Sequence, residues 1–227
     1  MRWLFANLGP LDIYRPGRIT CAERPDVVLI QGFFLGHRAM EWHSEHLQSL
    51  GLRTAIPRLG GLLGIFQTHR VELAAQALVT YLDSLPADCR PWLVGHSLGG
   101  VIARYAMQVL GASGRVRGLI TLGTPHRGTP MAFAGLLTGP GLISLVPWQL
   151  RPASVLLRDL NAREWVECPL IAVVSPADLI CIAPRGEPPY LGHPHVEVRE
   201  LSDHGHTDLL WTREAKDLVA DVVLNQR

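Results

Sequence analysis

The chain has 227 residues, of which 48% are hydrophobic and 18% are charged. This composition provides enough apolar side chain for a sizeable core and excludes a chain that is disordered throughout. The 21 lysines and arginines nearly balance the 20 aspartates and glutamates, and the formal net charge of +1 argues against a dedicated binder of nucleic acid or of anionic membranes. We expect one domain over residues 1–227.

Apolar runs alternate with segments of helical period from residue 26 onward, which predicts an α/β fold with a mostly parallel sheet and helices on both faces. Residues 128–168 break this alternation, and a stretch of that length inside a domain is usually functional or structured in its own right. In chain order we predict strand 27–30, helix 39–50, strand 52–56, a Gly-rich loop at 59–66, helix 71–85, strand 92–94, helix 98–110, strand 116–122, strand 170–174, strand 196–201, and helix 212–225 with Thr212 as its N-cap.

The four cysteines show no CxxC spacing, so we expect free thiols packed as small hydrophobes rather than two disulfides; they are Cys21, Cys89, Cys168 and Cys181. No apolar run approaches the roughly 18 residues that span a bilayer, and the N-terminal segment lacks the apolar stretch of a secretory signal. We therefore expect no transmembrane segment and a cytoplasmic location.

A candidate nucleophile lies in the segment GHSLGG, residues 95–100. It stands between a predicted strand and a predicted helix, the setting in which a GxSxG motif forms a nucleophile elbow. The tight turn presents the hydroxyl of Ser97 above the sheet, and Gly95 and Gly99 leave room for the strand and the helix to approach. The alternative is an ordinary Gly-Ser turn.

A serine hydroxyl needs a general base and an acid that orients it, and in this fold they follow the serine in the order acid, then histidine. Asp178 lies just after a predicted strand and is our choice of acid over Asp159 and Asp203, which fit solvated surface charges. His206, on a loop after the last strand, is our choice of base over His204.

The oxyanion formed on attack needs two backbone N–H donors. We expect one from Leu98, the residue after the nucleophile, and one from Phe33 in the loop that follows the first strand; the alternative for that loop is a plain Gly-rich turn. His193 and His195 with the two later histidines suggest a metal cluster, but they lack a compact ligand spacing, so we expect solvent-facing histidines, no metal and no cofactor.

These residues resemble the α/β-hydrolase superfamily, and within it bacterial triacylglycerol lipases and related esterases. The resemblance runs from about residue 26 to the end: GHSLGG is similar to the lipase box, residues 121–128 (TLGTPHRG) to the segment after the nucleophile helix, and residues 154–161 to the end of the lid region. It implies a triad of Ser97, Asp178 and His206, with Phe33 and Leu98 as oxyanion donors.

One departure concerns the oxyanion loop, where the family usually has His-Gly and this chain has Gln31-Gly32. Because the donor is a backbone amide, we expect the chemistry to survive this departure, which affects the support of the loop and the orientation of the substrate. The Gly32-Phe33 form is similar to the subgroup that acts on medium and long acyl chains.

The resemblance implies hydrolysis of an acyl ester or lipid through an acyl-enzyme on Ser97. We expect residues 129–160 to form a lid or cap and an acyl-chain site that contacts a lipid interface transiently, with a fixed cap as the alternative. The expected substrate-binding residues are Phe34, Leu142, Val146 and Trp148. Phospholipase, thioesterase and amidase activities use the same constellation, and a catalytically silent scaffold that binds apolar ligands or protein partners is an alternative from another class.

Overall fold

A computed structural model describes residues 22–33, 36, 38–60, 67, 69–133, 144–182 and 184–225. Its strands form one parallel sheet in the order β2-β1-β3-β4-β5-β6. The strands are β1 (Val27–Ile30), β2 (Thr54–Ala55), β3 (Trp92–His96), β4 (Gly118–Leu122), β5 (Leu170–Val174) and β6 (Val196–Glu200). All carboxyl ends of the strands therefore meet at one edge of the sheet, where ligands bind in open α/β folds.

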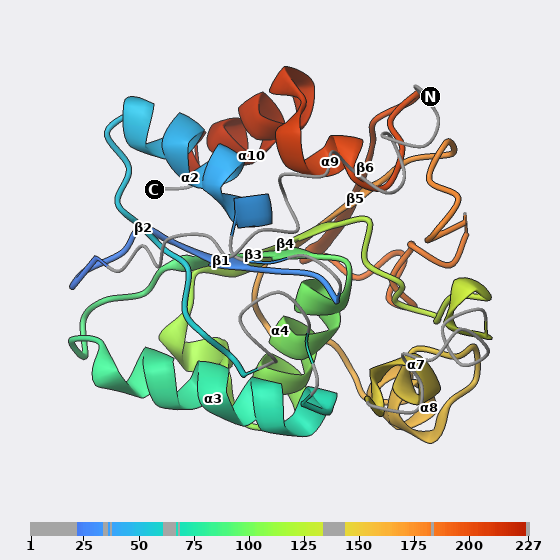
Figure 1. Cartoon of the computed structure of the whole chain (residues 1–227). Helices are drawn as coiled ribbons and strands as arrows, with labels where there is room; N and C mark the ends of the chain where they lie inside the picture. Colours follow the sequence, from blue (N-terminus) through green and yellow to red (C-terminus); the bar gives the residue numbers. More distant parts are fainter. Residues whose placement is uncertain are drawn as a thin grey trace.

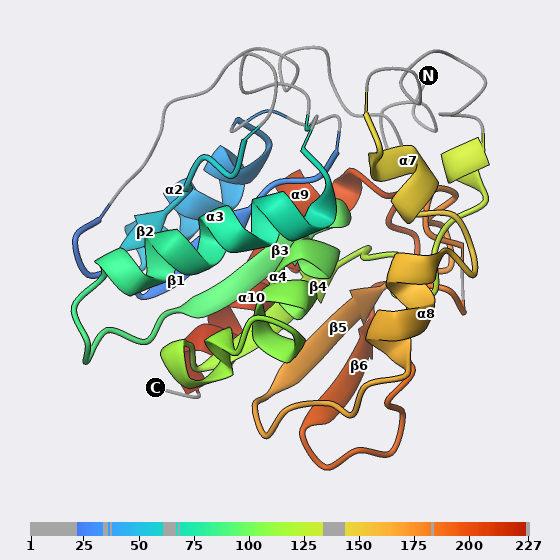
Figure 2. The same ribbon diagram turned by 90° about the horizontal axis from the view of Figure 1, so that it is seen from below.

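Helices cover both faces of the sheet. In Figure 1 the sheet is seen nearly edge-on, with α2, α9 and α10 above it and α3 and α4 below it. Figure 2 shows the face that α3 and α4 cover; α8 contacts α4, and α7 contacts α8. The helices are α2 (Arg38–Ser49), α3 (Val71–Ser84), α4 (Leu98–Gln108), the 3₁₀ helix η2 (Ala112–Arg115), α7 (Val146–Gln149), α8 (Val155–Asn161), α9 (Asp208–Trp211) and α10 (Arg213–Asn225).

The apolar core is split by the sheet into two layers, because successive strand residues point to opposite faces. In β1, Val28 and Ile30 pack with α3 and α4, whereas Val27 and Leu29 pack with α2 and α10. All four are buried, as the run of consecutive apolar residues predicts for a central strand. The edge strand β6 is mostly half-exposed and carries charged residues.

The sequence-based elements agree with the structure within two residues at each end, and the parallel sheet with helices on both faces is confirmed. Four short helices were not predicted, η2, α7, α8 and α9, because each is too short for a periodic apolar pattern to develop. Most of the predicted Gly-rich loop, residues 61–66, lies outside the described residues. Thr212 precedes α10 as expected, but its hydroxyl donates to the carbonyl of Asp208 and so closes α9.

The segment that breaks the alternation contains α7 and α8, and its residues 134–143 lie outside the described part. Helix α8 begins after Ser154, whose hydroxyl accepts the N–H of Leu157 at 3.3 Å, and it packs on α4. The role of residues 129–160 as a lid stays a prediction.

Within the described chain no helix is long and apolar enough to cross a membrane. Cys89, Cys168 and Cys181 are buried free thiols, as expected, and Cys21 lies outside the described residues.

Candidate active site

Ser97 occupies a sharp turn between β3 and α4 and has φ 52° and ψ −119°. This left-handed backbone is unfavourable for a non-glycine residue, and such strain persists only where the surroundings hold it. Three hydrogen bonds hold this backbone. The N–H of Ser97 donates to the carbonyl of Leu122 at 2.8 Å, and its carbonyl accepts from the hydroxyl of Thr124 at 3.0 Å and from the N–H of Gly100 at 3.1 Å. Ser97 thus has the backbone of a nucleophile elbow.

The two glycines that flank Ser97 are required by close backbone contacts. A Cβ added to Gly95 would lie 2.5 Å from the backbone nitrogen of Gly100, and one added to Gly99 would lie 2.3 Å from the carbonyl oxygen of Ile30. Both distances are far shorter than van der Waals contact. The GxSxG spacing therefore allows β3, α4 and β1 to approach closely enough for the turn to form.

Asp178 and His206 form a buried pair at the same edge of the sheet. Nδ1–H of His206 donates to Oδ2 of Asp178 at 2.7 Å, and both side chains are at least nine-tenths buried. The other carboxylate oxygen accepts the backbone N–H groups of Ile180 at 2.9 Å and Cys181 at 2.7 Å. This arrangement holds the imidazole in one orientation and places the lone pair of its neutral form on Nε2, the nitrogen that a general base uses.

The carboxyl group of Asp178 is held in its charged form. Burial alone raises the pKa of Asp178. The charge of His206, the hydrogen bond from its ring and the two backbone N–H groups together lower this pKa by more than burial raises it, so the net shift is downward. An ionised carboxylate next to the ring stabilises an imidazolium as it forms. The site can therefore support proton abstraction by His206.

The competing residues lie elsewhere. Asp159 and Asp203 are exposed, and His204 is tied to the carbonyl of Ser202 through Nδ1 at 2.7 Å. The rings of His193 and His195 make a tilted contact with each other, with centroids 5.7 Å apart. Among the residues that the structure describes, no three His, Cys, Asp or Glu side chains are placed to hold a metal ion.

Ser97 and His206 are linked through His96, the last residue of β3. The imidazole of His96 contacts that of His206 with centroids 4.7 Å apart, and its Nε2 lies 3.0 Å from the carbonyl oxygen of His206. Since Ser97 is the next residue, the structure brings the predicted nucleophile, base and acid to one edge of the sheet. The separation in sequence is 110 residues between His96 and His206.

The loop with the predicted oxyanion donor also lies next to Ser97. A Cβ built on Gly32 would be 3.3 Å from Cβ of Ser97 and 3.0 Å from Nδ1 of His96. Phe33 follows and is half-buried, and Leu98 is the first residue of α4, so its N–H has no carbonyl partner within the helix. Leu98 directly follows Ser97, and Phe33 follows Gly32, the residue close to Ser97. The role of both as oxyanion donors stays a prediction.

Comparisons with known proteins agree with this architecture. The model of a family described as "PGAP1-like alpha/beta domain" matches residues 67–139. A monoacylglycerol lipase of Paleococcus ferrophilus has a TM-score of 0.68 and 15% identity, covering 89% of this chain and 96% of its own. Bacillus licheniformis lipase BlEst2 in its mature form has a TM-score of 0.72 and 13% identity, covering 92% of this chain and 96% of its own. The chain has the α/β-hydrolase fold.

A thermophilic esterase from Thermogutta terrifontis shares this α/β-hydrolase fold, with a TM-score of 0.63, 19% identity, and coverage of 88% of this chain and 89% of its own. The search of curated proteins gave no match. At these identities the likeness establishes the fold, and the chemistry has to be argued from the site itself.

The predicted substrate-binding residues differ in their placement. Phe34 and Leu142 lie outside the described residues. Val146 has no exposed surface and packs in the core, so its side chain cannot touch a substrate in this conformation. Trp148 is 45% exposed on α7, where it stacks on the guanidinium of Arg151 at 4.9 Å.

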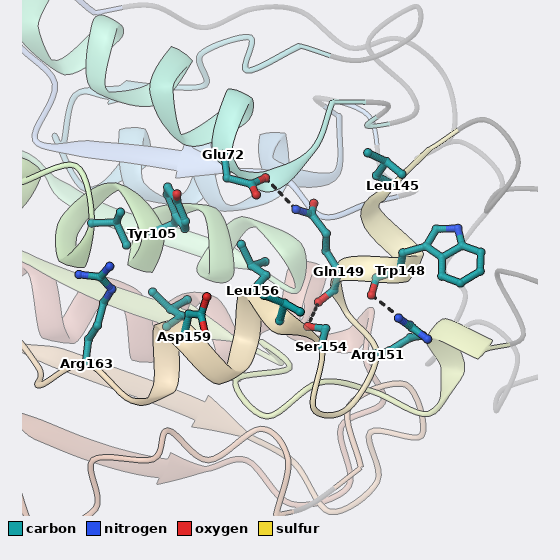
Figure 3. Close-up of a pocket in the computed structure, with 13 residues that line it drawn as sticks. Glu72, Tyr105, Leu145, Trp148, Gln149, Arg151, Ser154, Leu156, Asp159 and Arg163 are labelled. Carbon is teal, nitrogen blue, oxygen red and sulfur yellow. Dashed lines mark hydrogen bonds between the residues drawn. The ribbon is translucent and has the colours of Figure 1, made fainter.

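Trp148 lines a hollow of about 360 Å³ between α3, α4, α7 and α8, shown in Figure 3. Gln149 connects α7 to α3 at this hollow: its Oε1 accepts the N–H of Val71 at 2.9 Å, and its Nε2 donates to Glu72 at 2.7 Å. Tyr105 of α4 also lines it, about 12 Å along the helix from Ser97. This hollow is therefore separate from the nucleophile.

A buried arginine network behind the elbow was not predicted. Arg104 of α4 is fully buried, and its guanidinium donates to Nδ1 of His126 at 3.2 Å, to Asn161 at 3.0 Å and to the hydroxyl of Tyr190. No carboxylate contacts it within the described residues. Burial lowers the pKa of Arg104 and that of His126, the latter helped by the arginine charge. The network links α4 to α8, and Arg104 is seven residues beyond Ser97, a spacing that shares a helix face.

Gly123 provides a specific test of the Asp178–His206 geometry. It has φ +54°, and an added Cβ would lie 2.8 Å from Oδ2 of Asp178 and 3.1 Å from Nδ1 of His206. We expect Gly123→Ala to displace this pair and to lower by about 100-fold the rate of any reaction in which His206 acts as the base, with an additional backbone strain of about 1–2 kcal/mol. Steady-state kinetics and urea unfolding measure the two effects.

Gly111→Ala is the matched control, because Gly111 has φ +76° and nothing within 4 Å of an added Cβ. It should lose a similar amount of stability and keep full activity. Equal activity in the two variants would contradict the importance of the Asp178–His206 geometry.

Proposed function

We propose that the chain is a serine hydrolase of carboxylic esters that acts through an acyl-enzyme on Ser97. The observation that carries the proposal is the buried Asp178–His206 pair at the sheet edge where Ser97 sits in a strained turn. A scaffold without catalysis has no need of an ionised, buried carboxylate bonded to an imidazole beside an elbow serine. The fold shared with a lipase and an esterase adds support.

The reaction begins with attack of Oγ of Ser97 on the ester carbonyl while Nε2 of His206 takes the hydroxyl proton. The tetrahedral oxyanion accepts hydrogen bonds from the backbone N–H groups of Leu98 and Phe33. The ester C–O bond then breaks, and the protonated His206 gives its proton to the leaving alcohol. A water molecule, deprotonated by His206, attacks the acyl-enzyme. The bond between the acyl carbon and Oγ of Ser97 then breaks, His206 returns its proton to Oγ, and the acid is released. Asp178 stabilises the imidazolium in both halves.

We propose medium- or long-chain acyl esters as the substrates. Large apolar side chains are exposed on the described parts of the predicted lid and on the loop of the acid: Met131, Phe133, Leu145, Trp148, Leu179 and Ile182. Each buried CH₂ of an acyl chain contributes roughly 0.8 kcal/mol to binding, so such a surface selects for chain length without charged contacts. One of the structural neighbours is a monoacylglycerol lipase, and a monoacylglycerol is an acyl ester.

A panel of p-nitrophenyl esters of graded acyl length, with a thioester and a phospholipid, tests the function together with a fluorophosphonate probe. We expect the probe to label Ser97, as located by peptide mass spectrometry, and kcat/KM to rise from short to medium chains. An unlabelled protein would contradict the serine hydrolase, and faster turnover of the thioester or phospholipid would correct the substrate class.

A further inference from the structure

His96 is a buried residue that contacts the predicted base and directly precedes the predicted nucleophile in the chain. It precedes Ser97, has no exposed surface, and contacts His206 in two ways: through the ring, with centroids 4.7 Å apart, and through Nε2, 3.0 Å from the carbonyl oxygen of His206. Because a carbonyl oxygen only accepts hydrogen bonds, Nε2 of His96 must carry the proton.

The position of this proton also defines the other ring nitrogen of His96. With the proton on Nε2, the neutral His96 has a lone pair on Nδ1, which is buried without a partner among the described residues. The space beside this atom belongs to the oxyanion loop, since a Cβ on Gly32 would lie 3.0 Å away. His96 therefore touches the two loops that flank Ser97, one with each side of its ring.

The charge state of His96 is also defined. Burial, with the charge of His206 as the next cause, lowers the pKa of His96 to about 3, and the other ionisable groups that act on it are Asp178 and His43. His96 therefore stays neutral when His206 becomes protonated. A neutral neighbour adds no repulsion to an imidazolium 4.7 Å away, whereas a cation there would oppose its formation.

We propose that His96 is a positioning residue, which fixes the loop of the base through the carbonyl of His206 and seats the imidazole of His206 against its own neutral ring. This proposal rests on the proposed function, because a base needs such positioning only if it transfers a proton. His96 itself touches no reacting atom; it acts through His206.

His43 provides a matched control. It is also fully buried, its Nε2–H donates to the carbonyl of Leu209 at 2.9 Å, and burial lowers its pKa to about 4. Both histidines thus hold carbonyl groups of the segment 206–209, but the ring contact with His206 is made by His96. A merely structural role predicts the same behaviour for the two.

The kinetic experiment compares His96→Phe, His96→Gln and His43→Phe with the parent on one p-nitrophenyl ester. We expect His96→Phe to lower kcat by about 10- to 100-fold with KM within about twofold, because the displaced base affects the chemical step. Glutamine places an amide N–H near the position of Nε2 and should recover kcat to within about fivefold of the parent. His43→Phe should lower the melting temperature comparably while kcat changes by less than about threefold.

Either of two kinetic results would overturn the proposal: His96→Phe with parental kcat, or His96→Gln and His43→Phe as slow as His96→Phe. A second measurement does not depend on ester hydrolysis. Imidazole ¹⁵N–¹H correlation spectra of the parent should show His96 as the Nε2–H tautomer with no titration between pH 5 and 8, and the His206 signals should shift more in His96→Phe than in His43→Phe.

An Nδ1–H tautomer of His96, or its protonation in that pH range, would overturn the proposal whatever the activity. If the parent hydrolyses no ester while the spectra show the expected tautomer and shifts, the proposed function fails and the contact between His96 and His206 stands. The two failures are thus distinguished.

Discussion

Replacing Ser97 by alanine is expected to lower kcat for ester hydrolysis by about 10⁶-fold. The hydroxyl is the atom that forms the acyl bond, so the remaining catalysis comes from the oxyanion donors and from binding, which together leave about 10³–10⁴-fold over water. Alanine keeps the Cβ and fits the same strained turn, so the variant should fold normally. The measurement is a steady-state rate with a p-nitrophenyl ester, together with fluorophosphonate labelling.

Ser49→Ala is the control for the loss of a hydroxyl, because Ser49 lies at the exposed end of α2 and bonds only the carbonyl of His46 in the described structure. Its activity should equal that of the parent. A Ser97→Ala protein that hydrolyses esters at the parental rate would show that the activity belongs to another residue or to a contaminant.

Acidification from pH 7.5 to pH 5 is expected to reduce the free energy of unfolding by about 4 kcal/mol through two buried histidines, with a further loss from His126. The cause is the pair of buried histidines whose pKa values burial lowers, to about 4 for His43 and about 3 for His96. In the unfolded chain both titrate near 6.5. At pH 5 the unfolded state therefore binds two protons that the folded state does not, at about 2 kcal/mol for each histidine.

The direction of this effect follows from proton linkage. A histidine whose folded pKa is depressed favours the fold above its unfolded pKa, and that stability is lost as the pH falls from about 6.5 toward the folded value. Asp178 has a depressed carboxyl pKa, so its stabilising contribution is present above about 3.8 and does not change in this window. His126, with a pKa well below 6.5, acts in the same direction as the two histidines.

Urea unfolding at a series of pH values measures the effect, and His43→Gln provides the control. Glutamine keeps a donor for the carbonyl of Leu209 but does not titrate, so the loss between pH 7.5 and pH 5 should shrink by about 2 kcal/mol. A pH dependence identical to that of the parent would mean that His43 is protonated in the folded state or does not titrate differently on unfolding.

The amino-acid sequence by itself determined the order and bounds of the main elements, and it located the elbow. Those features depend on neighbours in the chain: β1 and β3 are short apolar runs, and α3 has an apolar stripe. The glycines at 95 and 99 indicate a tight turn around Ser97, because a side chain at either position would clash with the backbone. The carboxyl-edge placement of Asp178 also followed from its position directly after a predicted strand.

Tertiary structure decided what no local pattern contains. That Asp178 rather than Asp159 or Asp203 bonds His206 depends on burial and on a contact across 28 residues, and the link between His96 and His206 spans 110. Val146 belongs to the same apolar segment as Trp148, yet the fold buries one and exposes the other. The periodicity of apolar residues indicates which side chains share one face of a helix or strand. It does not indicate which residues of other elements they contact, because many residues have similar local patterns and only the packing of the elements selects among them.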